Sequence, residues 1–229
     1  MFSLSIVETI LRDRQTFFAG IRQGRNLGEK TRAMLIASVA FLALYGAVMG
    51  STHSLLQVAS SAVKLPLLFL ATLAICAPAL YFFNLIFGSS QSLSQNIALM
   101  LTAITVTAVV LLSFAPIVLF FILTSSSYQF FKLLNVGVCS IAGTVGALFL
   151  AQGMRAVSTS GSSGAGTRSR VVRLWIVVYA FVGSQAAWTL RPFVGAPSMH
   201  FELFRQLGGN FYTNIFASLG EILGFVAVR

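Results

Sequence analysis

Residues Ile97–Leu123 read IALMLTAITVTAVVLLSFAPIVLFFIL, an apolar run without a single charged side chain. A helix needs about 20 residues to cross the hydrocarbon core of a bilayer, and this run exceeds that length. Four other runs come close to it or exceed it, at residues 33–51, 65–87, 133–153 and 172–190. The sequence therefore predicts an all-α integral membrane protein, with a bundle of five transmembrane helices in a membrane domain over residues 33–190.

Composition and the placement of acids limit the chemistry. Apolar residues make up 57% of the chain and charged residues 9%, with a mean hydropathy of +0.88. Soluble domains carry about a quarter charged residues. No Asp or Glu lies between Lys30 and Phe201. Carboxylate catalysis, a carboxylate metal cage or a proton relay would need an acid inside this apolar body. With only two histidines and two cysteines, we expect no enzyme, no catalytic residue, no cofactor and no metal site.

Basic residues predict the orientation in the membrane. The segment before the first run holds six Lys and Arg, and the connection at residues 155–171 and its border hold four more, out of 15 in the chain. With five spans these ten share one side, so the positive-inside rule places the N-terminus in the cytoplasm and the C-terminus across the membrane. The connection is rich in Ser and Gly and is expected to be a flexible cytoplasmic loop.

The same distribution bears on partners and location. It accounts for the net charge of +10, so we expect no nucleic-acid partner. The expected partners are the lipid bilayer and other membrane proteins or further copies of the chain. Because no apolar run lies close to Met1, no cleaved signal is expected. The bacterial plasma (inner) membrane, or an internal membrane derived from it, fits these features.

The segment at residues 1–32 has helical periodicity. Within Phe2–Gly24 the apolar side chains recur on one face, at Ile6, Val7, Ile10, Leu11, Phe17, Phe18 and Ile21. Basic side chains lie opposite them, at Arg12, Arg14, Arg22 and Arg25. The pattern predicts a basic amphipathic helix, which either lies on an anionic membrane surface or docks on the protein's own cytoplasmic loops.

The tail at residues 191–229 is expected on the non-cytoplasmic side. Within it, Asn210–Val228 is apolar enough to suggest a sixth span. Asn214 and Glu221 lie seven residues apart and so on one helical face. We therefore favour an amphipathic helix lying in the membrane interface.

Polar and small side chains inside the spans are the first candidate sites. The amides of Asn84, Asn135 and Gln185 are costly in lipid, and they either bind a substrate or join neighbouring helices by hydrogen bonds. The fourth run carries small residues at three- and four-residue spacing, which are Gly137, Ser140, Gly143, Gly146 and Ala147. They predict close packing against another helix, in this chain or in another protein.

A polar and aromatic cluster follows the fifth run. Trp188 and Arg191 lie at the end of a span, which is the usual position of interfacial anchor residues. Glu202 and Arg205 follow on the same side of the membrane, and Glu202 is able to pair with Arg205 or Arg191. The cluster is either a cap on the bundle or a docking surface for a partner.

The layout resembles a known family. The basic segment Glu8-Thr9-Ile10-Leu11-Arg12-Asp13-Arg14-Gln15-Thr16-Phe17-Phe18 precedes closely spaced spans, and Pro78 is a turn-like proline. Over about Ile6–Gly153 this is similar to the Yip-domain (Ypt-interacting protein) membrane proteins and their bacterial relatives. The resemblance implies a non-enzymatic five-span protein with a cytoplasmic N-terminus. Eukaryotic members are linked to membrane trafficking and small GTPases. The stretches Trp188–Phe193 and Phe201–Arg205 are not part of the family's pattern.

The sequence favours one function and leaves a second open. The first is a non-catalytic membrane scaffold or accessory subunit of a larger membrane assembly. It would act through helix packing at the small residues of the fourth run and through its basic cytoplasmic helix. The second is a transporter or channel for a small neutral or anionic solute, with the amides and the helix-kinking Pro78 and Pro116 forming its path.

Overall fold

The computed structural model describes residues 2–86, 91–125, 127–157, 165–195, 200–204 and 209–223. These residues form eight α-helices and no strand. The helices are α1 (Phe2–Arg12), α2 (Arg14–Arg22), α3 (Leu27–Gly50), α4 (Leu55–Ile86), α5 (Leu93–Thr124), α6 (Tyr128–Val157), α7 (Ala165–Leu190) and α8 (Phe211–Ile222).

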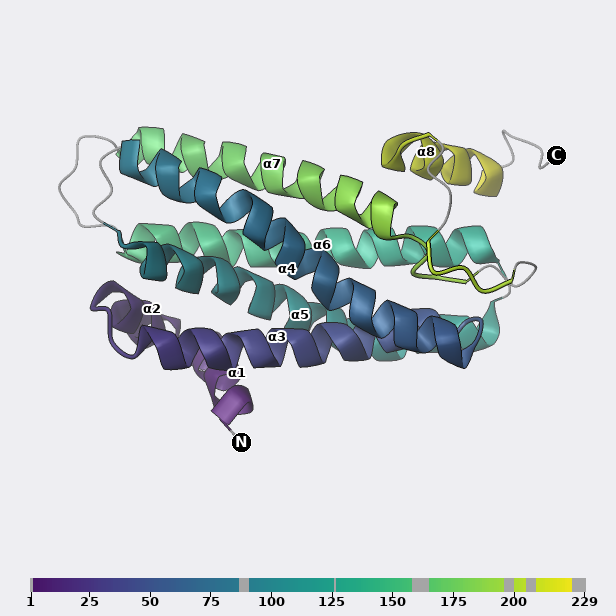
Figure 1. The fold of residues 1–229 in the computed structure, drawn as a ribbon, viewed down its shortest axis with the longest axis horizontal. Coiled ribbons are helices and arrows are strands. Elements are labelled where there is room, and N and C mark those ends of the chain that lie inside the picture. Colours follow the sequence, from purple (N-terminus) through teal and green to yellow (C-terminus); the bar gives the residue numbers. More distant parts are fainter. Residues whose placement is uncertain are drawn as a thin grey trace.

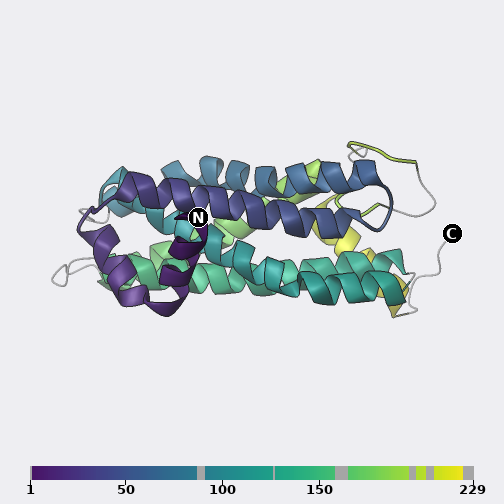
Figure 2. The same cartoon turned by 90° about the horizontal axis from the view of Figure 1, so that it is seen from below.

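The five long helices, α3 to α7, lie side by side along the length of the molecule (Figures 1 and 2). They alternate in direction along the chain. The short helix α2 lies at one end of the bundle and α8 lies beside the other end, and we call these the α2 end and the α8 end. Helices α3, α5 and α7 run toward the α8 end, and α4 and α6 run back.

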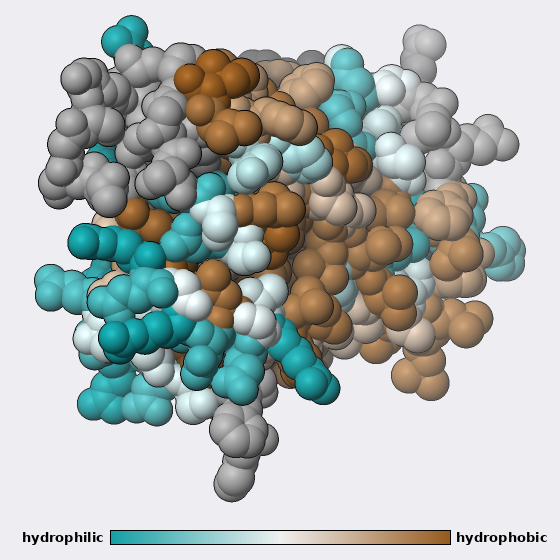
Figure 3. Space-filling model, turned by 60° about the vertical axis from the view of Figure 1, so that its left-hand side comes forward, coloured by the Kyte–Doolittle hydropathy of each residue, from teal (hydrophilic) through white to brown (hydrophobic). Residues whose placement is uncertain are grey.

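Within the described residues, four helices are long and apolar enough to cross a membrane: α3, the part Leu55–Phe83 of α4, α5 and α6. Large apolar side chains also cover the outside of the bundle, such as Ile75 at 64% exposed and Phe120 at 59%. An apolar surface of this extent is suited to lipid. Figure 3 brings the α2 end forward and shows hydrophilic residues gathered there, with a hydrophobic surface behind them. The fold is that of a multi-pass membrane protein.

The long helices form an open ring in the order α6, α5, α3, α4, α7. Each packs along the next in that order, whereas α6 and α7, the two ends of the series, make only slight contact. Glycines allow the closest approaches. A Cβ on Gly50 of α3 would lie 2.7 Å from Val58 Cα of α4, and a Cβ on Gly146 of α6 would lie 2.7 Å from the Ala103 carbonyl oxygen of α5. The ring is tightly packed on one side and open between α6 and α7.

Buried hydrogen bonds join the helices of the packed side. The hydroxyls of Ser38 in α3 and Thr105 in α5 lie 3.0 Å apart. The Tyr45 hydroxyl of α3 donates to Asn135 Oδ1 of α6 at 2.8 Å, and all four side chains are buried. Polar groups away from water are costly unless they are paired, so these bonds fix which faces of the helices meet.

The N-terminal segment is two helices, so the prediction of one helix over Phe2–Gly24 is wrong. The chain breaks at Asp13, whose carboxylate accepts the Thr16 amide at 3.2 Å as the N-cap of α2. The apolar side chains, among them Ile10, Phe17 and Ile21, are buried against the bundle. The segment therefore packs on helices α3, α5 and α6 of its own protein, and not on cytoplasmic loops.

All five long helices begin before the apolar runs that predict them, and in three of them the difference is six residues or more. Helix α3 starts six residues before residue 33, α4 ten before residue 65, and α7 seven before residue 172. The expected loop at 155–171 is therefore partly helical at both ends, and its centre, residues 158–164, lies outside the described part. Pro78 lies inside α4, so its interpretation as a turn residue is wrong.

Helix α8 lies beside α6 and α7 (Figure 1), and its polar side is turned toward the protein. Asn214 Oδ1 accepts Lys132 Nζ of α6 at 2.8 Å, and Glu221 Oε2 accepts Gln129 Nε2 of α6 at 2.7 Å. On the outer side Phe216 is 71% exposed. Asn214 and Glu221 therefore share one side of α8, and this side contacts α6, since in lipid the polar side of a helix is satisfied by other helices.

Candidate functional site

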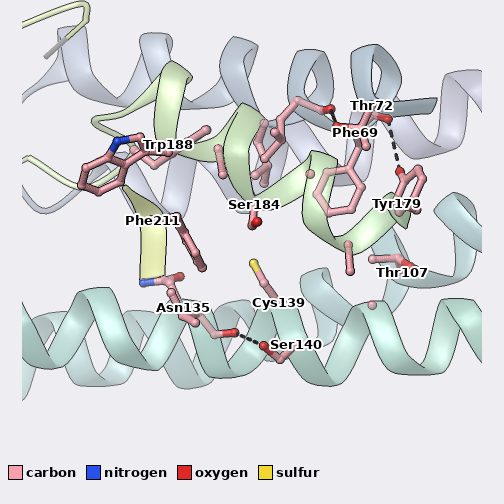
Figure 4. Close-up of a pocket in the computed structure, with 18 of the residues that line it drawn as sticks. Phe69, Thr72, Thr107, Asn135, Cys139, Ser140, Tyr179, Ser184, Trp188 and Phe211 are labelled. Carbon is pink, nitrogen blue, oxygen red and sulfur yellow. Dashed lines mark hydrogen bonds between the residues drawn. The ribbon is translucent and has the colours of Figure 1, made fainter. Parts of the chain in front are cut away.

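A cavity of about 920 Å³ lies on the open side of the ring, between α6 and α7. Figure 4 looks into it, between Asn135, Cys139 and Ser140 of α6 and Tyr179, Ser184 and Trp188 of α7. Helices α4 and α5 contribute Thr72 and Thr107, among others, to its wall. Phe211 and other residues of α8 line the cavity at the α8 end.

The wall of this cavity is apolar in effect, although several hydroxyl groups line it. Each Ser and Thr hydroxyl of the wall donates to a main-chain carbonyl three or four residues earlier in its own helix, at 2.7–2.9 Å; the residues are Thr72, Thr107, Ser140, Thr144 and Ser184. A hydroxyl satisfied in this way presents mainly its carbon atoms to the cavity. The middle of the cavity is therefore suited to hydrocarbon.

Charge gathers at one end of the cavity. Lys132 lies in the second turn of α6 and Arg191 follows the last residue of α7, so both lie at the α8 end. The guanidinium carbon of Arg191 lies 3.3 Å from the centre of the Trp188 ring, and Lys132 Nζ lies 5.8 Å from the Tyr128 ring. Among the described residues that line the cavity there is no Asp or Glu. The site is an apolar chamber with a cationic, aromatic end.

A buried polar stripe on α4 holds the segment that follows α7. Gln57, Ser61 and Lys64 recur on one face of α4 and are all buried. Ser61 Oγ donates to the Phe193 carbonyl at 2.6 Å, and Gln57 Nε2 and Lys64 Nζ donate to the Pro192 carbonyl at 3.1 and 3.4 Å. Pro192 and Phe193 line the cavity, so these bonds position its wall at the α8 end. The sequence analysis did not identify this stripe. The feature that could have revealed it is the spacing of its polar residues, four and then three apart, which places them on one face of a helix.

The small residues of α6 divide between two roles. Gly146 meets α5, as described above. Ser140, Gly143 and Ala147 line the cavity, which Gly146 also borders, and a Cβ on Gly143 would meet nothing within 4 Å. A Cβ on Gly137 would also meet nothing, and Gly137 does not line the cavity. Within this chain only part of the stripe packs against another helix.

The three amides also differ in their surroundings. Asn135 lines the cavity, and its Oδ1 accepts from Tyr45 while its Nδ2 donates to the Phe131 carbonyl at 2.9 Å. Gln185 is half-buried in α7. Asn84 lies in α4, and its side chain is outside the described part of the structure.

Of the cluster after the fifth run, the structure brings Trp188 and Arg191 together at the cavity. Glu202 is half-buried, and Arg205 lies outside the described residues. The basic side chains of the N-terminal segment are all exposed near the α2 end, namely Arg12, Arg14, Arg22 and Arg25. Arg12 pairs with Glu8 at 2.6 Å, an exposed ion pair worth little in stability.

Comparison with known proteins gives no relative from which a function could be transferred. No protein-family model, no curated protein and no solved structure matches this chain. The cavity between α6 and α7 and its cationic end are therefore the basis on which a function is proposed.

Proposed function

We propose that this chain is a non-enzymatic accessory protein of the membrane, which receives a hydrophobic guest from the bilayer in the cavity between α6 and α7. The observation that carries this proposal is the open side of the ring. A chamber of about 920 Å³ with an apolar wall lies where two helices of a membrane bundle would otherwise touch. This volume is at the upper part of the range of ligand pockets, roughly 300–1,000 Å³.

The size of the cavity favours a lipid-like guest over a transmembrane helix. A helix about 10 Å across displaces roughly 80 Å³ for each Å of its length. A volume of 920 Å³ then holds about 12 Å of helix, or about eight residues, well short of a span. A scaffold role through a partner's helix remains a proposal for the outer face of α6, where Gly137 offers open space.

We infer a fifth span in α7. The helix has 26 residues, and its outward side carries an apolar stripe at helical spacing, with Leu174, Val177 and Phe181 at 55–64% exposed. From residue 172 to 190 it is about 28 Å long, close to the thickness of the hydrocarbon core. Five crossings would put the basic α2 end in the cytoplasm and α8 on the other side, and the family resemblance also implies a cytoplasmic N-terminus. The proposed location is a bacterial plasma membrane or an internal membrane derived from it.

The number of spans is tested by cysteine labelling. In a protein with Cys76 and Cys139 changed to serine, we place one cysteine at Gln15 or at His200, both exposed and at opposite ends. Five spans predict that a membrane-impermeant maleimide added outside intact cells labels His200→Cys and reaches Gln15→Cys only after the cells are opened. Labelling of both positions from the same side would mean an even number of crossings and would exclude α7 as a span.

Transport of a small anionic solute is the second candidate function. The observation that favours it is the pair of cations, Lys132 and Arg191, at one end of the cavity. Against a polar path stands the apolar wall, in which the hydroxyl donors are already bound to main-chain carbonyls. Uptake of a water-soluble anion into liposomes that contain the protein would favour this candidate over the first.

Native mass spectrometry of protein purified in a mild detergent measures whether a guest molecule is bound to the chain. We expect one apolar or amphipathic molecule to remain bound per chain, because a cavity in the membrane fills with hydrocarbon. A protein that carries a varying number of phospholipids and loses them gradually, with no species of defined stoichiometry, would contradict the proposal. Lipids bound to the outer surface dissociate gradually in this manner.

A further inference from the structure

The volume and the length of the cavity together limit what its guest can be. At roughly 30 Å³ for a methylene group, close to the share of one water molecule in the liquid, 920 Å³ holds about 30 carbon atoms. We propose that the guest is a two-chain lipid, whose hydrocarbon chains of about 15 carbon atoms each lie side by side between α6 and α7. This inference rests on the proposed function and specifies its ligand.

The length of the cavity favours two chains over one. Its lining residues on α7 run from Trp175 to Arg191, about 24 Å along the helix, and those on α6 from Tyr128 to Leu150, about 33 Å. An extended chain advances about 3.5 Å for every three bonds, so a single chain of about 30 carbon atoms would be roughly 34 Å long and would exceed both walls. A chain of about 15 carbon atoms is roughly 16 Å long, so two of them fit beside each other and leave room for the group that joins them.

The middle of the cavity has the width for two chains, because both helices present small side chains to it. These residues are Ala180, Gly183 and Ala187 of α7 and Ser140, Gly143 and Ala147 of α6. A Cβ on Gly183 would have its nearest contact at 3.6 Å, with Thr72 of α4. Spread over about 24 Å, the volume of 920 Å³ gives a cross-section of about 38 Å². Packed hydrocarbon chains lie about 4.5 Å apart and take roughly 20 Å² each, so this cross-section corresponds to two chains.

Aromatic side chains close the α2 end of the cavity and set the direction of the guest. Trp175 is 4% exposed, and its Nε1 donates to the Cys76 carbonyl of α4 at 2.9 Å. The Tyr179 ring lies 5.2 Å from the Trp175 ring, and its hydroxyl donates to the Phe69 carbonyl at 3.4 Å. The polar atoms of this wall are thus bound within the protein, and its rings face the cavity as apolar surface. The chain ends of the lipid therefore point toward Trp175, and the group that joins them lies toward α8.

The charged side chains at the α8 end have partners within the protein, so the cavity does not require a charged guest. Lys132 donates to Asn214 Oδ1 at 2.8 Å and lies beside the Tyr128 ring. Arg191 is stacked on Trp188. Selection of the guest therefore depends on its chains, and an uncharged two-chain lipid such as a diacylglycerol is a sufficient probe.

The test counts bound molecules by native mass spectrometry of the full chain in a mild detergent. The probes are dipalmitoylglycerol, palmitic acid, and squalene, a single branched hydrocarbon of similar carbon number. We expect one dipalmitoylglycerol or two palmitic acids per protein chain at saturation, because each hydrocarbon chain fills half of the width. Dipalmitoylglycerol is expected to displace both fatty acids, and squalene to bind more weakly than dipalmitoylglycerol.

Two variants reduce the width from opposite walls. Ala180→Phe on α7 and Ser140→Phe on α6 each place a ring in the middle of the cavity. The ring displaces about three methylene groups of one chain, so each variant is expected to bind dipalmitoylglycerol roughly fiftyfold more weakly and to retain one palmitic acid instead of two. Leu174→Phe is the matched control, because residue 174 lies on the outward side of α7 and is 59% exposed. Its stoichiometry is expected to stay at two palmitic acids.

The possible results separate this inference from the proposed function. Saturation of the natural protein at one palmitic acid, or a fatty acid bound together with dipalmitoylglycerol, would overturn the two-chain guest while the proposed function stands. Tighter binding of squalene than of dipalmitoylglycerol would do the same and would assign the cavity to a branched single chain. Two palmitic acids bound to both Ala180→Phe and Ser140→Phe would place the lipid outside the cavity and overturn the inference. No binding of any probe would overturn both proposals.

Discussion

Protein carrying Gly146→Leu is expected to fail to form the bundle, and Gly146→Ala to form it with a loss of roughly 1–3 kcal/mol, the usual cost of overpacking. The reason is the contact of α5 with α6. A Cβ at residue 146 would lie 2.7 Å from the Ala103 carbonyl oxygen and against the Thr107 hydroxyl. A main-chain atom cannot turn aside as a side chain does, so the two helices must separate and give up buried contacts along their length.

Gly137→Ala is the matched control for this prediction. It lies on the same helix, and its Cβ would meet nothing within 4 Å. Because alanine is a better helix former than glycine, this variant is expected to be as stable as the natural protein or more stable, by up to about 1 kcal/mol. The measurement is thermal unfolding in detergent, with size-exclusion chromatography for the folded fraction. Equal stability of Gly146→Ala and Gly137→Ala would mean that α5 and α6 do not approach as described.

Gly143→Phe is expected to abolish tight binding of the guest and to leave the bundle folded. Gly143 lines the cavity, and a Cβ there has open space around it. The phenyl ring would occupy room for about three methylene groups of the guest. At about 0.8 kcal/mol for each buried methylene, the affinity falls roughly fiftyfold. Calorimetric titration with a long-chain fatty acid measures the change.

Gly137→Phe controls for the added aromatic ring. It places the same side chain on the same helix, two turns from Gly143 and outside the cavity. Its affinity for the fatty acid is expected to stay within twofold of that of the natural protein. If Gly143→Phe binds as well as Gly137→Phe, the guest does not lie between α6 and α7. If both variants unfold, the description of open space on α6 is wrong.

The positions of the apolar helices could be predicted from the sequence, and their ends could not. A run such as Ile97–Leu123 excludes any environment but lipid or a buried core, and α5 covers it entirely. The apolar run that predicts α4 starts at Leu65, and the polar residues Gln57, Ser61 and Lys64 precede it, whereas the helix begins at Leu55. Their partners are carbonyls more than 125 residues further along the chain, and only the fold brings them together.

Two other features could not be predicted from the sequence, because they depend on which helix surfaces contact each other in the fold. Asn214 and Glu221 share one face of α8, and that pattern fits water as well as it fits a polar neighbour; in the structure the neighbour is α6. The small residues of α6 fit a helix interface or a cavity wall equally well. Gly146 has the first role and Gly143 the second, because the order of helices in the ring leaves α6 without a long neighbour on one side.

The most direct test of the cavity uses a fatty acid with a photoreactive diazirine near the end of its chain, bound to the full protein in nanodiscs and cross-linked by light. Peptide mass spectrometry then locates the modified residues. A guest between α6 and α7 predicts cross-links to inward residues of α7, Ile176 and Ala180, which line the cavity. Cross-links confined to the outward residues of the same helix, Leu174, Val177 and Phe181, would place the fatty acid in the surrounding lipid and contradict the account.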